Sequence, residues 1–243
     1  MLSQAEKGGV QNTIQNCVTV LQNDPILADS IRLNLLSERI DIVKPMGWQR
    51  SGPTLTDMMY ILRRMEKYGL YSEKRVSAAI RIVANENHYH HIRDYLNDLK
   101  WDGVERISHA LHRFLGAAED ELTAEALKIF LLGAIKRVFH PGCKFEMMLC
   151  LVGGQGAGKS SFFRLLAIKD EWFSDDLRRL DDDNVFRKLQ GHWIMEMSEM
   201  IATANAKSIE EIKSFLSKQK ETYKIPYETH PADRLRQCVF AGT

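Results

Sequence analysis

The sequence predicts an α/β domain built on a parallel sheet and preceded by a smaller α-rich domain. Residues 147–152 (MMLCLV) form a continuous apolar run, which is typical of a strand buried on both faces. A glycine-rich loop and a helix-compatible segment follow at once, and short apolar runs then alternate with polar turns and helices. In residues 1–100, by contrast, apolar side chains recur at helical spacing.

Residues 1–100 are expected to form the α-rich domain. Helical periodicity covers residues 13–21, 57–69 and 72–86, and residues 40–43 fit a short strand. Such a helix set with a short β segment would suit a winged-helix DNA-binding domain, although no local feature requires one. The side chains expected to face the core are Met58, Ile61, Leu62, Met65, Val76, Ala79, Ile80 and Val83.

Residues 101–243 are expected to form the α/β domain. The turn signal Trp101-Asp102-Gly103 marks the boundary. A helix is predicted over residues 107–115, and a second over residues 123–139. The second is apolar on most sides and therefore expected to be well buried, and His140-Pro141-Gly142 ends it.

The composition excludes several protein classes. With 44% hydrophobic and 27% charged residues, the chain is neither a disordered tail nor a collagen-like repeat. The net charge of +1 gives no overall basic field, so any contact with DNA must use a local patch. No apolar run approaches the ~20 residues of a membrane-spanning helix, and the N-terminus lacks a secretory signal, so we expect a cytoplasmic protein. The four cysteines are widely separated, which indicates reduced thiols.

The loop at residues 153–160 matches G-x-x-x-x-G-K-[ST] at every fixed position and stands between a predicted strand and a predicted helix. Glycines let consecutive backbone N–H groups surround phosphates, and the helix N-terminus adds positive charge. Lys159 is expected to reach the β- and γ-phosphates, and the Ser160 hydroxyl to ligate Mg²⁺. The expected nucleotide-binding residues are Gly153, Gly154, Gln155, Gly156, Ala157, Gly158, Lys159, Ser160 and Ser161.

A carboxylate at the end of a neighbouring strand should complete the metal site. Residues 191–197 (GHWIMEM) supply Glu196, and Glu199 follows three positions later. We expect Glu196 to hold the metal and Glu199 to orient the attacking water. Glu199 could instead only cap the next helix, because glutamates are common in first turns.

Several stretches together resemble the virulence-associated protein E family. The resemblance covers roughly the whole chain and is sharp from Tyr95 onward. It implies an α/β P-loop NTPase core of the AAA+ type, similar to superfamily-three helicases, with ATP and Mg²⁺ as cofactors. In that family Glu196 and Glu199 match an E-x-x-E motif. The stretches that carry the resemblance are YLNDLKWDGVERI (95–107), HPGCKFEMMLCLVGGQGAGKSSFF (140–163), GHWIMEMSEM (191–200), EEIKSFLS (210–217) and YKIPYETHPADRLRQCVFAGT (223–243).

The resemblance also implies roles for the C-terminal third. A helix is expected over residues 208–218, followed by paired strands at 223–227 and 236–241 around a basic tip. In superfamily-three helicases the corresponding hairpin contacts DNA phosphates in the pore of a ring, and Arg236 would be an arginine finger for a neighbouring nucleotide. The alternative is an ordinary solvated hairpin. Relatives usually carry arginine where this chain has Lys224, and lysine keeps the charge but cannot form the bidentate hydrogen bonds of a guanidinium group. The DNA-facing candidates are Lys213, Lys224, His230 and Arg234.

These features predict a Mg²⁺-dependent ATPase, a DNA helicase-like motor in replication of a phage or other mobile genetic element. The expected partners are single-stranded or duplex DNA through its backbone, further copies of the chain in a hexameric ring, and a primase or initiator. The family continues beyond Thr243 with a polar sensor residue and further helices, so we expect a fragment that hydrolyses ATP poorly. The alternative is a nucleotide-gated binding or recruitment module with little or no translocation.

Overall fold

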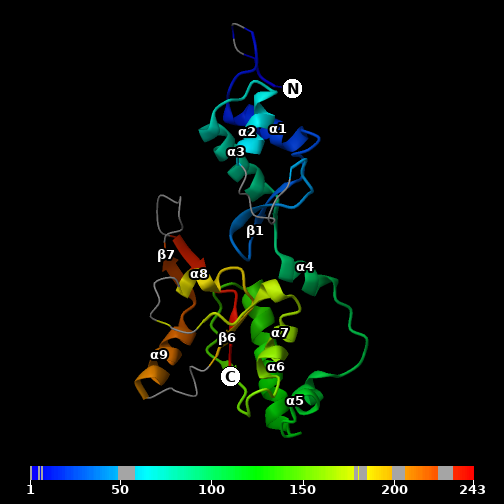
Figure 1. The fold of residues 1–243 in the computed structure, drawn as a ribbon, viewed down its shortest axis with the longest axis vertical. Helices are drawn as coiled ribbons and strands as arrows, with labels where there is room; N and C mark the ends of the chain where they lie inside the picture. The colour runs from blue at the N-terminus through cyan, green and yellow to red at the C-terminus, as the bar shows by residue number, and fades with distance from the viewer. Residues whose placement is uncertain are drawn as a thin grey trace. The chain divides into compact units, whose positions relative to one another are not determined.

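The computed structural model describes residues 2–4, 6, 8–48, 58–177, 180, 185–198, 206–223 and 232–243. It divides the chain into two compact units, residues 1–94 and 95–243 (Figure 1). This division falls within a helix, slightly before the turn at Trp101 where the sequence places the boundary.

The first unit packs helices against a small sheet with strand order β2-β1-β3. Strands β1 and β2 form an antiparallel hairpin, and β3 pairs with β1 in parallel. The sequence predicts a strand only near β2 and misses β1, which is equally short, and the two-residue β3. The elements are α1 (Ile14–Asn23), β1 (Ile31–Asn34), β2 (Arg39–Ile42), α2 (Met58–Glu66), α3 (Glu73–Glu86), β3 (His88–Tyr89) and α4 (His91–Asp98), which continues into the second unit.

The core of the first unit lies where α1 and α3 pack together. Cys17 and Leu21 of α1 are fully buried, and all four α3 side chains that the sequence places inward are buried as predicted. Ile61 and Met65 of α2 are also fully buried. The i, i+3, i+4 spacing of these side chains therefore predicts correctly which face of each helix is buried.

Asp24 is a buried acid at the end of α1. Its Oδ1 accepts hydrogen bonds from the N–H groups of Ile26 (2.9 Å) and Leu27 (3.1 Å). Its Oδ2 accepts from Arg64 Nε (2.8 Å) and Tyr68 Oη (2.6 Å). Burial alone would raise the pKa of Asp24, but these hydrogen bonds bring that pKa below its ordinary value. The acid thereby ties α1 to the end of α2.

The second unit is an α/β domain. Its elements are α5 (Ile107–Leu115), α6 (Glu121–Phe139), β4 (Met148–Cys150), α7 (Lys159–Leu166), a 3₁₀ turn (Asp170–Trp172), β5 (Phe173–Ser174), α8 (Val185–Leu189), β6 (Ile194–Met197), α9 (Ala206–Ser217), β7 (Lys220–Tyr223), β8 (Ala232–Leu235) and β9 (Val239–Gly242). Strands β4, β9, β6 and β5 form a parallel sheet in that order, as the sequence predicts for the core.

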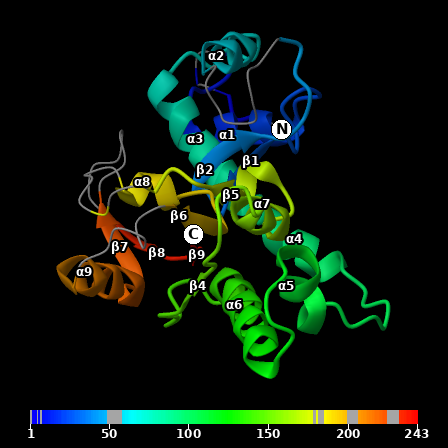
Figure 2. The same ribbon diagram turned by 60° about the horizontal axis from the view of Figure 1, so that its bottom comes forward.

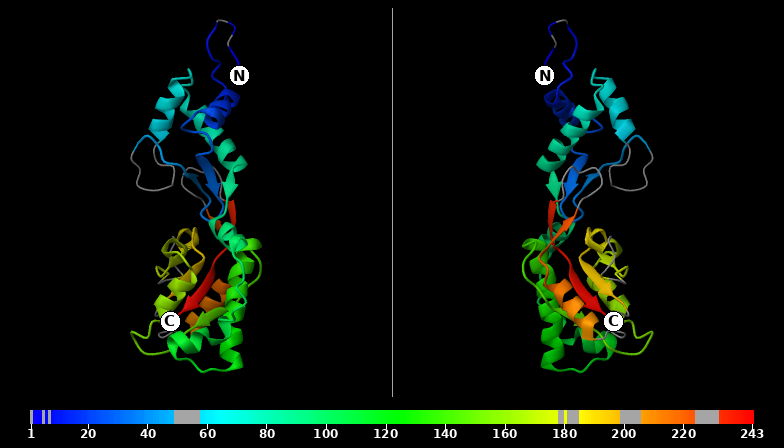
Figure 3. Two further views of the ribbon diagram at one scale, coloured as in Figure 1. Left: turned by 90° about the vertical axis from the view of Figure 1, so that its right-hand side faces the viewer. Right: turned by 90° about the vertical axis from the view of Figure 1, so that its left-hand side faces the viewer.

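The C-terminal strand corrects one prediction. Residues 236–241 are expected to pair within the hairpin, but β8 (Ala232–Leu235) pairs with β7 instead. Strand β9 enters the parallel sheet between β4 and β6, and Figure 3 shows it in red, running to the C-terminus. All four β9 residues, VFAG, are buried, because a central strand is covered on both faces.

Two layers of helices cover the sheet. Met195 and Met197 of β6 pack in one cluster with Phe215 of α9 and Phe240 of β9. Because side chains alternate along a strand, Glu196 lies on the opposite face. That face carries α6 and α7, and Figures 1 and 2 both show these helices across the sheet from α9. All four cysteines are free, as predicted.

Helix α6 is less buried than its sequence suggests. Its inner face, including Phe130 and Ala134, is buried, but an outer stripe is exposed. The prediction of a well-buried helix is wrong because no described element covers this side. In the described part of the chain, neither α6 nor any other helix is long and apolar enough to cross a membrane. The exposed stripe consists of Leu122, Ile129, Leu132, Ile135 and Phe139.

Gly133 allows the loop before β4 to lie against α6. A Cβ atom at this position would be 2.2 Å from Cζ of Phe145. We expect Gly133→Ala to lower the free energy of unfolding by about 1–3 kcal/mol, because the ring must move. Chemical denaturation measures this change. Gly133→Ala combined with Phe145→Ala should lose less than the sum of the single changes, whereas simple additivity would contradict the proposed clash.

Candidate functional site

The carboxyl ends of three parallel strands meet at one edge of the sheet. Cys150 of β4 and Met197 of β6 both pair with Gly242 of β9, so the three strands end in register. The residues that follow them, the glycine loop, Ser198 and Thr243, are therefore brought to the same edge. In open α/β sheets this edge is where ligands bind.

The glycine loop joins β4 to α7. Gly156 and Gly158 have φ angles of +79° and +81°, a left-handed conformation that favours glycine. Added Cβ atoms at Gly153, Gly154 and Gly156 would meet nothing within 4 Å, so packing does not explain these glycines. Their absent side chains leave backbone N–H groups open to a phosphate, as the motif requires.

Lys159, the first residue of α7, lies back across this loop. Its Nζ donates hydrogen bonds to the carbonyl oxygens of Gly153 and Gly154, both at 2.9 Å. No acid holds this ammonium group among the described contacts. The lysine is therefore placed over the loop in which phosphates would bind.

Ser160 and Glu196 meet as the sequence predicts for a metal site. The Ser160 hydroxyl donates to Glu196 Oε1 at 2.6 Å, although 36 positions separate the two residues. Thr243 Oγ1 donates to the same oxygen at 2.7 Å. Sequence analysis missed Thr243, but the signal was present: a polar residue ends the buried run VFAG, as the glycine loop ends the run at 147–152.

The second oxygen of Glu196 indicates what the site can hold. Glu196 is 0% exposed, and its Oε2 is buried with no hydrogen-bond partner. A buried carboxylate oxygen without a partner is destabilising unless a ligand satisfies it. Mg²⁺ prefers carboxylate and hydroxyl oxygens, and in phosphate sites it commonly uses only one or two protein ligands. The residues present therefore fit a magnesium ion.

Thr243 is expected to orient Glu196. Thr243→Val removes its hydroxyl group and should weaken Mg²⁺ binding about 10-fold, because it frees the carboxylate to rotate. Thr243→Ser keeps the hydroxyl and should bind Mg²⁺ nearly as the wild type does. Titration of Mg²⁺ at saturating ATP measures both, and equal Mg²⁺ affinity in the two variants would contradict this role.

The structure describes only some of the other predicted residues. Glu199, Lys224 and His230 lie outside the described residues. Lys213 is on α9, exposed and paired with Glu210 at 2.8 Å. Arg234 is on β8 and half-buried. The role of these two basic residues in DNA binding stays a prediction.

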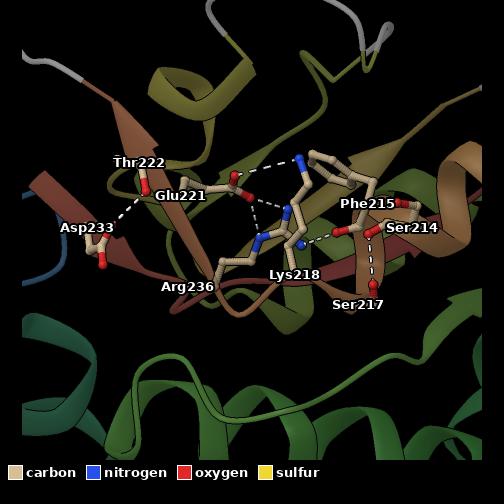
Figure 4. Close-up of polar contacts among 8 residues, drawn as sticks. All are labelled: Ser214, Phe215, Ser217, Lys218, Glu221, Thr222, Asp233 and Arg236. Carbon is tan, nitrogen blue, oxygen red and sulfur yellow. Dashed lines mark hydrogen bonds and ion pairs between the residues drawn. The ribbon is translucent and has the colours of Figure 1, made fainter. Parts of the chain in front are cut away.

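Arg236 is buried within the second unit, a position that the sequence does not suggest. It is 3% exposed, and its guanidinium pairs with Glu221 of the same chain (Figure 4). A third guanidinium nitrogen, Nη1, donates to the carbonyl oxygen of Phe215. This placement favours a role within one chain over an arginine finger for a neighbour, because reaching a neighbour would break the pair.

Comparisons with known proteins support the fold. Two A-form apo structures of the NrS-1 C-terminal region match this chain with a TM-score of 0.50 and 13% and 14% sequence identity. Each match covers 93% of this chain and 55% of the other, so the chain spans about half the length of these solved chains. The parallel sheet and this likeness fit a P-loop NTPase-like fold. A search of curated proteins finds no match.

A family comparison identifies the second unit. The model of the virulence-associated protein E-like domain matches residues 96–243, which is more than half of the chain. The match contains the glycine loop, Glu196 and Thr243. It begins just inside the second structural unit, which starts at Tyr95. The chain thus belongs to the virulence-associated protein E-like family.

Proposed function

We propose that this protein is a Mg²⁺-dependent ATPase whose activity is coupled to DNA. The observation that carries the proposal is the pairing of Ser160 with Glu196, which leaves one buried carboxylate oxygen unsatisfied beside the glycine loop. A hydroxyl and a carboxylate at this position are the protein ligands that bind Mg²⁺ in P-loop NTPases.

Each residue has a role in this proposal. The loop N–H groups and Lys159 bind the phosphates and neutralise charge that develops during transfer. Ser160 and Glu196 would hold Mg²⁺, which would neutralise negative charge on the phosphates. Thr243 keeps the Glu196 carboxylate oriented. Glu199, which is outside the described residues, is proposed to accept a hydrogen bond from the attacking water.

The DNA side of the proposal uses the hairpin β7–β8 and helix α9. Arg234 on the hairpin and Lys213 on α9 are proposed to contact backbone phosphates, which bind basic side chains without reading sequence. The resemblance to superfamily-three helicases supports replication as the process, with a ring of copies and a primase or initiator as partners. Lys224 and His230 complete the proposed contacts.

Steady-state phosphate release tests the proposal. The chain, extended past Thr243 if the natural protein is longer, should hydrolyse ATP only with Mg²⁺, and single-stranded or duplex DNA should stimulate the rate. Lys159→Ala should abolish ATP hydrolysis and its stimulation by DNA. Lys169→Ala, which changes a lysine outside the loop, should keep both. Tight ATP binding with slow turnover that DNA does not change would contradict the motor. That outcome would favour a nucleotide-gated recruitment module.

A further inference from the structure

Arg236 is the centre of a buried joint in the second unit. We define the Arg236 joint as Arg236, Glu221 and Phe215. Arg236 Nε donates to Glu221 Oε1 at 2.8 Å, and Nη2 contacts the same oxygen. The guanidinium also lies over the Phe215 ring, 4.3 Å from its centroid. Figure 4 shows these groups together, with Lys218 paired to the other oxygen of Glu221 at 3.9 Å.

The joint connects three elements that are separate in sequence. Glu221 belongs to β7 of the hairpin, and Phe215 to the last turn of α9. Arg236 follows β8, and its carbon Cζ is 5.2 Å from the ring centroid of Phe240 in β9. The backbone strengthens the connection, because Arg236 N–H donates to Gln219 O at 3.0 Å. Hairpin, helix and central strand are therefore held by one side chain.

Strand β9 continues from this joint to the metal carboxylate. It pairs with β4, which carries the glycine loop, and with β6, which carries Glu196. Directly after β9, the Thr243 hydroxyl contacts Glu196 Oε1. A displacement of the hairpin base would thus move β9, and the movement of this short strand would shift Thr243 and Glu196.

The chemistry of the joint suits orientation more than stability. A buried ion pair adds little stability compared with a well-packed apolar pair of similar size. The ion pair instead fixes orientation. The planar guanidinium donates its hydrogen bonds in fixed directions, so the carboxylate and the carbonyl oxygen can occupy only a narrow range of positions. The Arg236 joint therefore fixes how the hairpin is oriented on β9.

We propose that Arg236 is a positioning residue that couples the β7–β8 hairpin to the nucleotide site within one chain. This inference rests on the proposed function for its two ligands, DNA and Mg²⁺-ATP. It assigns the coupling to the Arg236 joint. Binding of one ligand changes the orientation of the hairpin on β9, and this orientation changes the affinity for the other ligand.

The test compares DNA affinity with and without nucleotide. Fluorescence anisotropy gives the Kd of a labelled single-stranded oligonucleotide alone and with Mg²⁺ plus a non-hydrolysable ATP analogue. The wild type should show at least a fivefold difference between the two Kd values. Arg236→Met combined with Glu221→Leu should reduce this ratio to within about twofold of one, because the directional link is lost.

The double variant is chosen so that it folds. Removing one partner alone would leave a buried charge and be strongly destabilising, whereas replacing both by apolar residues is often neutral. Thermal unfolding and affinity for the ATP analogue should therefore stay near wild-type values. The matched control is Lys128→Met with Glu125→Leu, which removes an exposed ion pair from α6 and should leave the ratio between the two Kd values unchanged.

Three results would overturn the inference: a wild-type ratio of one, a full ratio in the double variant, or recovery of hydrolysis when the double variant is mixed with Lys159→Ala. Recovery would show that Arg236 acts on a neighbour's nucleotide. Failure of the proposed function is distinct, since a chain that does not hydrolyse ATP but keeps the nucleotide-dependent Kd ratio would refute hydrolysis and retain the joint.

Discussion

Glu196→Gln should reduce Mg²⁺-dependent ATP hydrolysis by about 100-fold or more, because a neutral amide replaces the anionic carboxylate proposed to bind the metal. The free energy of unfolding without Mg²⁺ should not fall. In the wild type, Glu196 is fully buried with Oε2 unsatisfied, so the native state carries the cost of a desolvated charge. Loss of activity without loss of stability is the signature of a functional residue.

Phosphate release across a Mg²⁺ titration and chemical denaturation measure these two effects. Glu210→Gln is the matched control, since Glu210 is exposed and contacts only Lys213 among the described residues. The control should change neither quantity. A Glu196→Gln variant that unfolds more easily yet hydrolyses ATP normally would show that the carboxylate is structural.

Asp24→Asn should lower the stability of the first unit by about 3 kcal/mol. The substitution removes the charge that pairs with Arg64 and receives the Tyr68 hydroxyl, and breaking a buried pair on one side costs about 3–5 kcal/mol. The lower end applies because the Arg64 side chain is 22% exposed. Hydrogen exchange of α1 and α3 measures the effect within this unit.

The same substitution should remove a pH dependence. The pKa of Asp24 is lower in the folded state, so its contribution is present above the unfolded pKa of about 3.9 and is lost as the pH falls through the folded value. Acidification should thus destabilise the wild type more than Asp24→Asn. Asp29→Asn, at an exposed ion pair with Lys44, should follow the wild-type pH profile. Parallel acid profiles of the wild type and Asp24→Asn would contradict this assignment.

The arrangement of the candidate site could be largely predicted because its signals are local. The glycine loop needs consecutive residues of fixed type, and the strand and helix that flank it are consecutive as well. Glu196 follows a short apolar run, and the rule that strand ends share one edge placed it near the loop. Thr243 follows the same rule, but a single threonine carries too little information to be selected without the neighbouring strands.

The hairpin and Arg236 could not be predicted in the same way. Arginine, glutamate and phenylalanine at 236, 221 and 215 have no local pattern that pairs them. The apolar run at 238–241 fits either a hairpin strand or a central strand of the sheet, since periodicity cannot distinguish them. Only the pairing of β9 with β4 and β6 shows which alternative holds, and Phe240 then packs against Phe215 with ring centroids 5.2 Å apart.

The sequence by itself therefore determined the class of fold, the glycine loop between a strand and a helix, and the carboxylate near it, since each depends on residues that are neighbours in the chain or on the ends of parallel strands. The tertiary structure alone decided that β9 lies at the centre of the sheet, that Thr243 contacts Glu196 and that Arg236 is buried against Glu221. The two side-chain contacts join residues 15 and 47 positions apart, and the pairing of β9 with β4 joins residues still farther apart. Their formation depends on how whole elements pack, which local spacing does not encode.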